Sequence, residues 1–371
     1  MDTKLNAFCI AGTSSGDGKT TVTLALLRAL YKRGLKVQPF KCGPDYIDPM
    51  FHNIACRNKS RNLDCWMMGV DNVKQSYRHA VKDADCAVVE GVMGMFDSSK
   101  PGSLDGSTAQ VAAELDIPVL LTVNCSGMAG SIAALVKGYS EFYNKSNIVG
   151  VIANKVGSEN HASILREALN IANLPPLIGY LVKDKKWNLK ERHLGLVPAG
   201  ENIKSEEWLD SLAETAEKCF DIDKILNITR TKKEEPDKIL ISKNKKRLAV
   251  AYDKAFNFYY EDNFDILNEN GFDLIKFSPI NDLCLPEDIA GVYLGGGFPE
   301  IFAKELEANN SMIESIKKYV EDGGRIFAEC GGFMYLTKSL TDRSGKVYKM
   351  CNLIPAVSKM DNKLRSLGIV K

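Results

Sequence analysis

The 371-residue sequence has no excess of either charge and no long apolar run. Its 48 lysines and arginines are matched by 47 aspartates and glutamates, so no global field favours nucleic acid or an anionic membrane as a partner. No apolar run approaches the roughly 18 residues that a membrane-spanning helix requires. We therefore expect a soluble, cytoplasmic protein that binds neither nucleic acid nor membranes.

Histidine is scarce, with four residues, and the ten cysteines form no Cys-x-x-Cys pair. Several cysteines, such as Cys9 and Cys86, lie within apolar runs, where this residue packs as a small hydrophobic group. The pattern argues against a disulfide framework and against a zinc site, and it fits a reducing compartment. The length is sufficient for two domains with separate cores.

The first two hundred residues alternate between short apolar runs, which indicate buried strands, and longer amphipathic segments, which indicate helices. The expected strands are 7–11, 36–40, 87–91, 117–123, 148–154 and 177–182. The expected helices between them are 20–33, 106–115 and 131–142. Such alternation is typical of an α/β domain in which helices cover both faces of a parallel sheet.

A second alternating series follows a break in the pattern. An amphipathic helix is expected at 201–221, and the lysine- and glutamate-rich residues 229–247 have the composition of a linker. The later expected strands are 248–252, 272–277, 291–294 and 325–328, with a last helix at 332–340. We therefore predict an α/β domain at 1–200, a helix and charged linker at 201–245, and a smaller α/β domain at 246–371.

A glycine-rich loop joins the first expected strand to the first expected helix, which is the context of a phosphate-binding loop. Its glycines allow backbone N–H groups to face an anion. Lys19 would reach the β- and γ-phosphates of a nucleotide, and the Thr20 hydroxyl would coordinate Mg²⁺. The alternative is a turn without a ligand. The residues predicted to bind nucleotide are Gly12, Thr13, Ser14, Ser15, Gly16, Asp17, Gly18, Lys19, Thr20 and Thr21.

Four more polar residues follow expected strands, and ligands bind at the carboxyl ends of parallel strands. Glu90 lies at the end of the strand at 87–91, and we expect it to hold Mg²⁺. Lys41 would offset charge on an acyl phosphate, while Asp45 and Asp48 would bind metal or orient a substrate. The alternative for this second group is a Pro-Asp turn with solvated carboxylates.

Cys330 stands between a short apolar strand and two glycines that open a helix. Small residues around a nucleophile permit a sharp, strained elbow, and a helix N-terminus favours the thiolate. Backbone N–H groups of Gly296 and Gly297 would stabilise the oxyanion formed when this thiolate attacks a glutamine amide. The alternative is a packing cysteine. No histidine follows Cys330 in the sequence to act as the general base that such a thiol needs.

These motifs resemble those of the cobyrinic acid a,c-diamide synthase family, in the same order along essentially the whole chain. The resemblance implies a phosphate-loop domain like that of dethiobiotin synthetase, followed by a flavodoxin-like class I glutamine amidotransferase domain. The loop 43–48, Gly-Pro-Asp-Tyr-Ile-Asp, is its most specific part. The matching segments are 12–21, 40–49 with Phe51 and His52, 90–97, 195–198, 295–300 and 328–336.

The resemblance further implies a ligase of cobalamin biosynthesis that uses ATP, Mg²⁺ and glutamine to amidate the a- and c-carboxylates of a corrinoid through acyl phosphates. In this scheme Cys330 releases ammonia, and metal and substrate are organised by Asp45, Asp48, Glu90 and Asp97. A homodimer and nickel-sirohydrochlorin as the substrate are left open. A carbon dioxide-using ligase would leave the second domain without a purpose, and a partitioning ATPase would carry a second lysine early in the loop.

The sequence departs from the family pattern in two places. Family members continue beyond the region that matches 365–371 and supply a catalytic histidine there. We therefore expect a C-terminally truncated member with an incomplete glutaminase domain and impaired or lost use of glutamine. The second departure is Ser98-Ser99, where the family usually has a glycine after Asp97.

Overall fold

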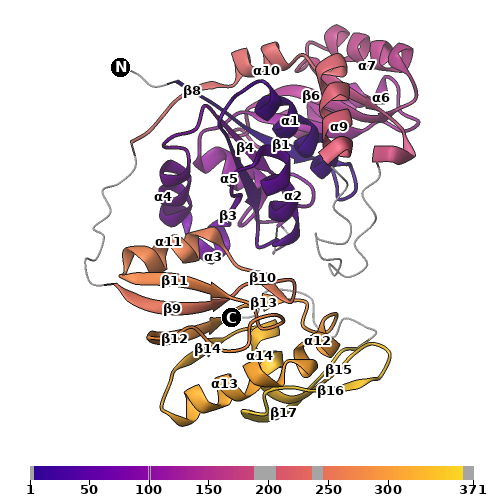
Figure 1. Cartoon of the computed structure of the whole chain (residues 1–371). Coiled ribbons are helices and arrows are strands. Elements are labelled where there is room, and N and C mark those ends of the chain that lie inside the picture. The colour runs from indigo at the N-terminus through magenta and orange to yellow at the C-terminus, as the bar shows by residue number, and fades with distance from the viewer. Residues whose placement is uncertain (1–3, 99, 101, 188–205, 236–244, 362–371) are drawn as a thin grey trace. The chain divides into compact units, whose positions relative to one another are not determined.

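The computed structural model describes residues 4–98, 100, 102–187, 206–235 and 245–361 (Figure 1). The described residues divide into two units, of which the first comprises the residues up to 187 together with 206–235 and the second comprises 245–361. Each unit has its own sheet and its own core. No helix among the described residues is long and apolar enough to cross a membrane. The motif at 195–198 lies outside the described residues.

The first unit is built on an eight-stranded sheet. Its strands are β1 (Lys4–Gly12), β2 (Val37–Cys42), β3 (Arg61–Leu63), β4 (Cys86–Glu90), β5 (Val119–Asn124), β6 (Ile148–Val156), β7 (Leu177–Val182) and β8 (Arg230–Lys232). The order is β3-β2-β4-β1-β5-β6-β7, with all neighbours parallel, and β8 pairs antiparallel with β1. The carboxyl ends of β2, β4 and β1 therefore lie next to one another along the edge of the sheet at which its parallel strands end, and ligands of such folds bind there.

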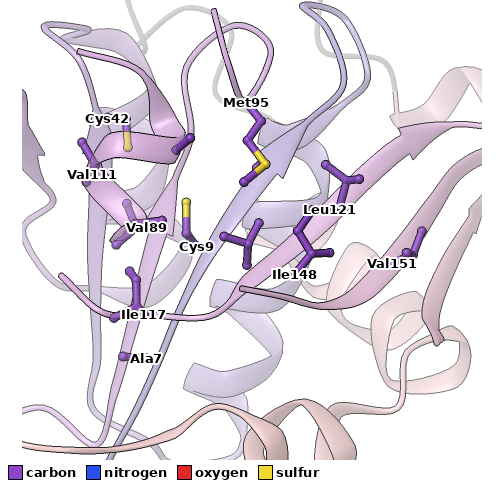
Figure 2. Close-up of a cluster of buried hydrophobic side chains, with 14 of the residues drawn as sticks. Ala7, Cys9, Cys42, Val89, Met95, Val111, Ile117, Leu121, Ile148 and Val151 are labelled. Carbon is purple, nitrogen blue, oxygen red and sulfur yellow. The ribbon is translucent and has the colours of Figure 1, made fainter. Parts of the chain in front are cut away.

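Helices cover both faces of this sheet because successive side chains of a strand point to opposite faces. The helices are α1 (Lys19–Lys32), α2 (Ile47–Cys56), α3 (Cys65–Met68), α4 (Val70–Ala80), α5 (Thr108–Glu114), α6 (Ser131–Phe142), α7 (Glu159–Ile171), the 3-10 helix η1 (Lys185–Trp187), α9 (Glu206–Cys219) and α10 (Ile222–Ile228). On β1, Cys9 packs into the core with α4 to α7, whereas Phe8 packs into the core with α1, α2, α9 and α10. Figure 2 shows Cys9 gathered with Val89 and Leu121 from the two adjacent strands.

The second unit contains a smaller parallel sheet in the order β11-β9-β12-β14. In chain order this is 2-1-3-4, the arrangement of flavodoxin-like folds. Helix α11 packs on one face of this sheet, and α12, α13 and α14 pack on the other. The strands are β9 (Lys246–Ala251), β10 (Phe256–Phe258), β11 (Phe272–Phe277), β12 (Ile289–Leu294), β13 (Gly296–Gly297), β14 (Ile326–Ala328), β15 (Thr337–Thr341), β16 (Val347–Lys349) and β17 (Ile354–Lys359). The helices are α11 (Glu261–Glu269), α12 (Ala303–Ala308), α13 (Asn310–Glu321) and α14 (Gly331–Leu336).

The predicted fold class, two successive α/β units with parallel sheets, is confirmed. Every strand expected from an apolar run coincides with an observed strand to within a few residues. The helix expected at 332–340 is too long, because the chain becomes extended at Thr337 and continues as β15. The described cysteines are free, and most of them are buried, as their apolar surroundings predict.

The predicted linker at 229–247 is wrong at its start, where β8 extends the first sheet. The preceding helices belong to the same unit, since Leu212, Ala216 and Ile225 pack into its core. Composition hides this arrangement because antiparallel pairing uses backbone groups and needs no apolar side chain. Residues 236–244 of the predicted linker lie outside the described residues.

Candidate active site

The phosphate loop begins at Gly12, the last residue of β1, and ends at Lys19, the first residue of α1. Gly16 and Gly18 have φ angles of +85° and +91°, which side chains disfavour. A side chain at Gly18 would also place its Cβ 2.0 Å from Asn154 Nδ2. Glycine is therefore required at position 18 for two independent reasons.

Asp17 holds the loop in shape from within, and its side chain is buried. Asp17 Oδ2 accepts hydrogen bonds from Thr13 Oγ1 and from the Ser14 backbone N–H, both at 2.6 Å. Asp17 Oδ1 accepts another from Ser14 Oγ at 3.0 Å. The carboxylate thus accepts hydrogen bonds from the Thr13 and Ser14 groups at the start of the loop and fixes their orientation. Its role in this structure is to shape the loop.

Three residues from β6 and α6, none of them predicted from the sequence, hold the loop from outside. Asn154 Nδ2 and Lys155 Nζ donate to the carbonyls of two successive loop residues at 2.7 and 2.9 Å. The Tyr139 hydroxyl donates to the Thr13 carbonyl at 2.6 Å. The available signal was an Asn-Lys pair near the carboxyl end of an apolar strand, at the edge of the sheet where ligands bind.

The remaining loop residues take different positions. Lys19 Nζ donates to the Ser14 carbonyl at 3.0 Å, so its side chain crosses back over the loop. Burial and the positive charge of Lys41 lower the pKa of Lys19. Ser15 is exposed, whereas Thr21 is buried and its hydroxyl lies 3.5 Å from a backbone carbonyl that follows β7. Thr21 therefore faces the interior of the unit, and its contact with nucleotide stays a prediction.

Beside the loop, predicted site residues meet around one carboxylate at the end of β4. Glu90 Oε1 accepts hydrogen bonds from Thr20 Oγ1 at 2.7 Å and from Lys41 Nζ at 2.9 Å. Lys41 Nζ also lies 2.7 Å from Asp48 Oδ2. Lys41 is 4% exposed and Glu90 is 0% exposed, so these charges are compensated by one another rather than by bulk water. The structure thus brings together Thr20, Lys41, Asp48 and Glu90.

Glu90 stays ionised despite its position. Burial is the largest single influence, and it raises the pKa of this carboxyl. The positive charge of Lys41 and the hydrogen bond from His52 lower the pKa, and their combined effect is greater than that of burial. The resulting pKa of Glu90 lies well below its ordinary value. The site therefore presents a fixed negative charge beside the phosphate loop, which suits it to bind a cation.

His52, for which no role was predicted from the sequence, completes this cluster. Its Nε2 lies 2.6 Å from Glu90 Oε2, and its Nδ1 lies 3.0 Å from Ser60 Oγ. On α2, His52 follows Asp48 by one helical turn, so the two side chains project from the same face. This spacing of four on a helix that follows the second strand was the available signal.

Asp45 and Asp97 make local contacts that shape the backbone. Asp45 Oδ1 accepts from the backbone N–H of Ile47 at 2.8 Å and so fixes the start of α2. Asp97 Oδ2 accepts from the Gly94 N–H at 2.7 Å and closes a turn beside the phosphate loop. These contacts favour positioning roles for both carboxylates, and their predicted catalytic roles stay predictions.

Cys330 in the second unit follows β14 with φ +49° and ψ −114°, a backbone conformation that non-glycine residues rarely adopt. Its side chain is exposed, and α14 begins at the next residue. The following backbone is pinned, because the Gly332 N–H donates to the Gly295 carbonyl at 2.8 Å. A Cβ at Gly332 would lie 2.2 Å from the Leu294 carbonyl oxygen. This is the strained elbow that the sequence predicts.

The predicted oxyanion loop lies beside this thiol. Gly296 and Gly297 form β13, which pairs with β10, and a Cβ at Gly296 would lie 3.5 Å from Cys330 Sγ. The Gly295 N–H already donates to the Tyr259 hydroxyl at 2.8 Å, and this hydroxyl donates to a carbonyl of β9 at 2.5 Å. Gly295 is thus committed to holding the loop. The part of Gly296 and Gly297 in binding an oxyanion stays a prediction.

A histidine base is not present among the described residues of the second unit. His52, His79 and His161 belong to the first unit, and His193 lies outside the described residues. The segment 365–371, on which the expectation of a truncated end was based, also lies outside them. What the structure shows of the thiol site is therefore the exposed Cys330 thiol and its backbone neighbours.

Comparisons with known proteins match both units. A family described as "CobQ/CobB/MinD/ParA nucleotide binding domain" matches residues 8–197, and one described as "CobB/CobQ-like glutamine amidotransferase domain" matches 247–371. A cobyrinate a,c-diamide synthase of Dehalococcoides mccartyi (strain 195) is 44% identical over 98% of this chain and 80% of that protein. One from Priestia megaterium is 42% identical over 97% of this chain and 79% of that protein. Chloroplast FtsY from Physcomitrella patens superposes on 48% of this chain and 59% of its own, with a TM-score of 0.35 and 16% identity.

Proposed function

Because the chain belongs to the cobyrinate a,c-diamide synthase family, we propose that it amidates the a- and c-carboxylates of cobyrinic acid in the cytoplasm. The enzyme is an ATP-dependent, glutamine-using ligase of cobalamin biosynthesis. The first unit would carry the ATP chemistry, and the second unit would release ammonia from glutamine.

The observation that best supports the ATP chemistry is the meeting of Thr20 and Lys41 on Glu90 Oε1, at 2.7 and 2.9 Å. Thr20 is the second residue of α1, directly after Lys19, and Lys41 comes from β2, which neighbours the strand of Glu90. Cations and hydroxyl groups at the edge of a parallel sheet are suited to holding nucleotide phosphates and offsetting their charge.

Mg²⁺ fits the donors present at this edge. The Thr20 hydroxyl and the carboxylates of Asp48 and Glu90 are the hard oxygen ligands that this ion prefers. Among the described residues no group of three or more histidine, cysteine or acidic side chains could hold a metal alone. A protein cage of that kind is not required, since Mg²⁺ beside a nucleotide is usually held by one or two carboxylates, phosphates and water. When bound, it would neutralise charge on the β- and γ-phosphates.

The proposed reaction has two steps at each substrate carboxylate. A carboxylate oxygen attacks the γ-phosphorus of ATP while the bond from this phosphorus to the bridging oxygen of ADP breaks, which gives an acyl phosphate. Ammonia then attacks the acyl carbon, loses a proton and displaces inorganic phosphate. Lys19 and Lys41 would offset the negative charge of the phosphoryl group, while Asp48 would help to orient the reactants.

Ammonia release is proposed to take place at Cys330. The thiolate attacks the amide carbon of glutamine, the carbon–nitrogen bond breaks as nitrogen takes up a proton, and ammonia departs. Water then hydrolyses the thioester to give glutamate. The exposed thiol, its strained backbone and the glycine loop beside it support this assignment.

A mass-resolved assay tests the proposal. Cobyrinic acid and MgATP are incubated with either glutamine or ammonium, and C330A is the matched variant. We expect two amides to be added with ammonium by both proteins, because ammonium does not need the thiol. The proposal fails if cobyrinic acid gains no amide with either nitrogen source, and product from nickel-sirohydrochlorin alone would assign a different macrocycle.

A further inference from the structure

Lys41 has no hydrogen-bond donor left for a substrate in this structure. An ammonium group has three N–H donors, and three oxygens lie around Lys41 Nζ. They are Asp48 Oδ2 at 2.7 Å, Glu90 Oε1 at 2.9 Å and the Gly91 carbonyl at 3.0 Å. Lys41 therefore cannot contact a phosphoryl group or an acyl phosphate until it gives up one of these oxygens.

The position that this ammonium occupies has the properties of a metal site. Glu90 Oε1 is also the partner of Thr20 Oγ1, the hydroxyl expected to bind Mg²⁺. The atoms that converge here are carboxylate, carbonyl and hydroxyl oxygens, which are the donors Mg²⁺ prefers. The ammonium group of Lys41 supplies the positive charge that faces both buried carboxylates, Asp48 and Glu90.

We propose that Lys41 holds the cation position between Asp48 and Glu90 in the nucleotide-free protein and gives it up to Mg²⁺ when MgATP binds. Once released from these carboxylates, Lys41 contacts the phosphoryl group and offsets its negative charge. The inference rests on the proposed function, since it assigns Mg²⁺ to this cluster. Lys41 would then be an exchangeable counterion of the two carboxylates rather than a fixed one.

The charges around Lys41 explain why the exchange would require nucleotide. Burial and, after it, the positive charge of Lys41 lower the pKa of Lys19, so the two ammonium groups are near enough to repel each other. Without nucleotide, a released Lys41 would have no new anion to approach. With ATP in the loop, the γ-phosphate offers negative oxygens to both lysines. Metal and nucleotide should therefore bind together.

Removal of the ammonium should uncover a site for free Mg²⁺. In the full chain without nucleotide, we expect K41M to unfold roughly 5 to 10 °C below the wild type in EDTA, because two buried carboxylates lose their cation. Millimolar Mg²⁺ should restore roughly half of this loss in K41M and leave the wild type unchanged. If K41M does not accumulate as folded protein, K41Q is measured in the same way.

Two control variants separate cation exchange from general destabilisation. Arg28 also pairs with two carboxylates, Glu206 and Asp210. These two residues belong to α9, away from the phosphate loop. R28M should lower the unfolding temperature without any response to Mg²⁺. The double variant K41M/D48N removes one charge of each sign, so it should recover much of the stability and lose the response to Mg²⁺.

A K41M protein that is destabilised equally with and without Mg²⁺ would overturn the inference, since Lys41 would then be a purely structural counterion. This readout needs neither corrinoid nor ATP turnover. If Mg²⁺ stabilises K41M but the wild type does not amidate cobyrinic acid, the inference stands and the proposed substrate is refuted. Amidation by the wild type without metal rescue in K41M would refute the inference alone.

Discussion

His52 Nε2 lies 2.6 Å from Glu90 Oε2, and neither side chain has exposed surface. The other ring nitrogen lies 3.0 Å from Ser60 Oγ, so the imidazole is held between a hydroxyl and a carboxylate. This contact occupies one oxygen of Glu90 and leaves the other for Thr20 and Lys41. His52 thus acts as a positioning residue, since it sets which carboxylate oxygen faces the phosphate loop.

The first prediction concerns His52. We expect H52N to lower kcat for ammonium-dependent amidation by about 10- to 100-fold, the usual effect of losing a group that orients a metal-site ligand. H52Q, whose longer amide reaches further toward Glu90, should lose less. The Mg²⁺ concentration that gives half-maximal amidation should rise in both variants. His161, which contacts backbone groups elsewhere in the unit, provides the control, and H161N should keep normal Mg²⁺ dependence.

The second prediction concerns acid stability. Since the pKa of Glu90 is held below its ordinary value, the unfolded state takes up its proton at a higher pH than the folded state. Its charge therefore stabilises the fold fully above about pH 5, and this contribution is lost progressively as the pH falls from there toward the low pKa of Glu90 in the folded state. E90Q should be less stable than the wild type by about 3 kcal/mol at neutral pH, and this gap should shrink in acid.

Urea unfolding across this pH range measures the difference directly. Glu114, which pairs with Lys74 at 2.8 Å where both are about a third exposed, supplies the matched control. E114Q should change stability by less than about 1 kcal/mol at every pH. A gap between E90Q and the wild type that stays constant down to pH 3 would show that the charge of Glu90 is not what stabilises the fold.

The third prediction concerns the phosphate loop. G18A should weaken nucleotide binding by about tenfold or more, because φ at this position is +91° and the new Cβ would displace Asn154 from the loop. G34A is the control, since Gly34 has φ +83° and a Cβ added there would have no atom within 4 Å. It should lower stability by about 1 kcal/mol and leave the nucleotide Kd unchanged. Equal Kd values for the two variants would argue against a nucleotide site at this loop.

The fourth prediction concerns strain at Cys330. A residue with φ +49° and ψ −114° is held at a cost that glycine avoids. We therefore expect C330G to be more stable than C330A by about 1 kcal/mol, although glycine usually destabilises a folded protein relative to alanine. Both variants should lose glutamine hydrolysis. Chemical denaturation of the two proteins side by side decides the matter, and a less stable C330G would mean that the elbow stores no strain.

The sequence was informative where the structural signal is local. Glycines, a lysine and a threonine at fixed spacing between a strand and a helix indicate the phosphate loop without knowledge of distant contacts. The grouping of Lys41, Asp48 and Glu90 also follows from a simple rule, since neighbouring parallel strands end at the same edge. The structure brings these three residues together within hydrogen-bonding distance.

The sequence was uninformative where a contact depends on tertiary packing. The orientation of α2 decides that His52 meets Glu90, and the pairing of β6 decides that Asn154 reaches the loop. The return of residues 206–232 to the first unit also escaped prediction. A few apolar residues on one face of α9 are enough to dock a helix whose overall composition is polar.

The most direct test of the account follows oxygen from substrate to phosphate. Cobyrinic acid labelled with ¹⁸O in its a- and c-carboxylates is incubated with MgATP and ammonium, and the inorganic phosphate is examined by mass spectrometry. If a carboxylate oxygen attacks the γ-phosphorus beside Lys19, Lys41 and Glu90, one ¹⁸O appears in each phosphate released during amidation. Amide formation with unlabelled phosphate would contradict an acyl phosphate and, with it, the chemistry proposed for this site.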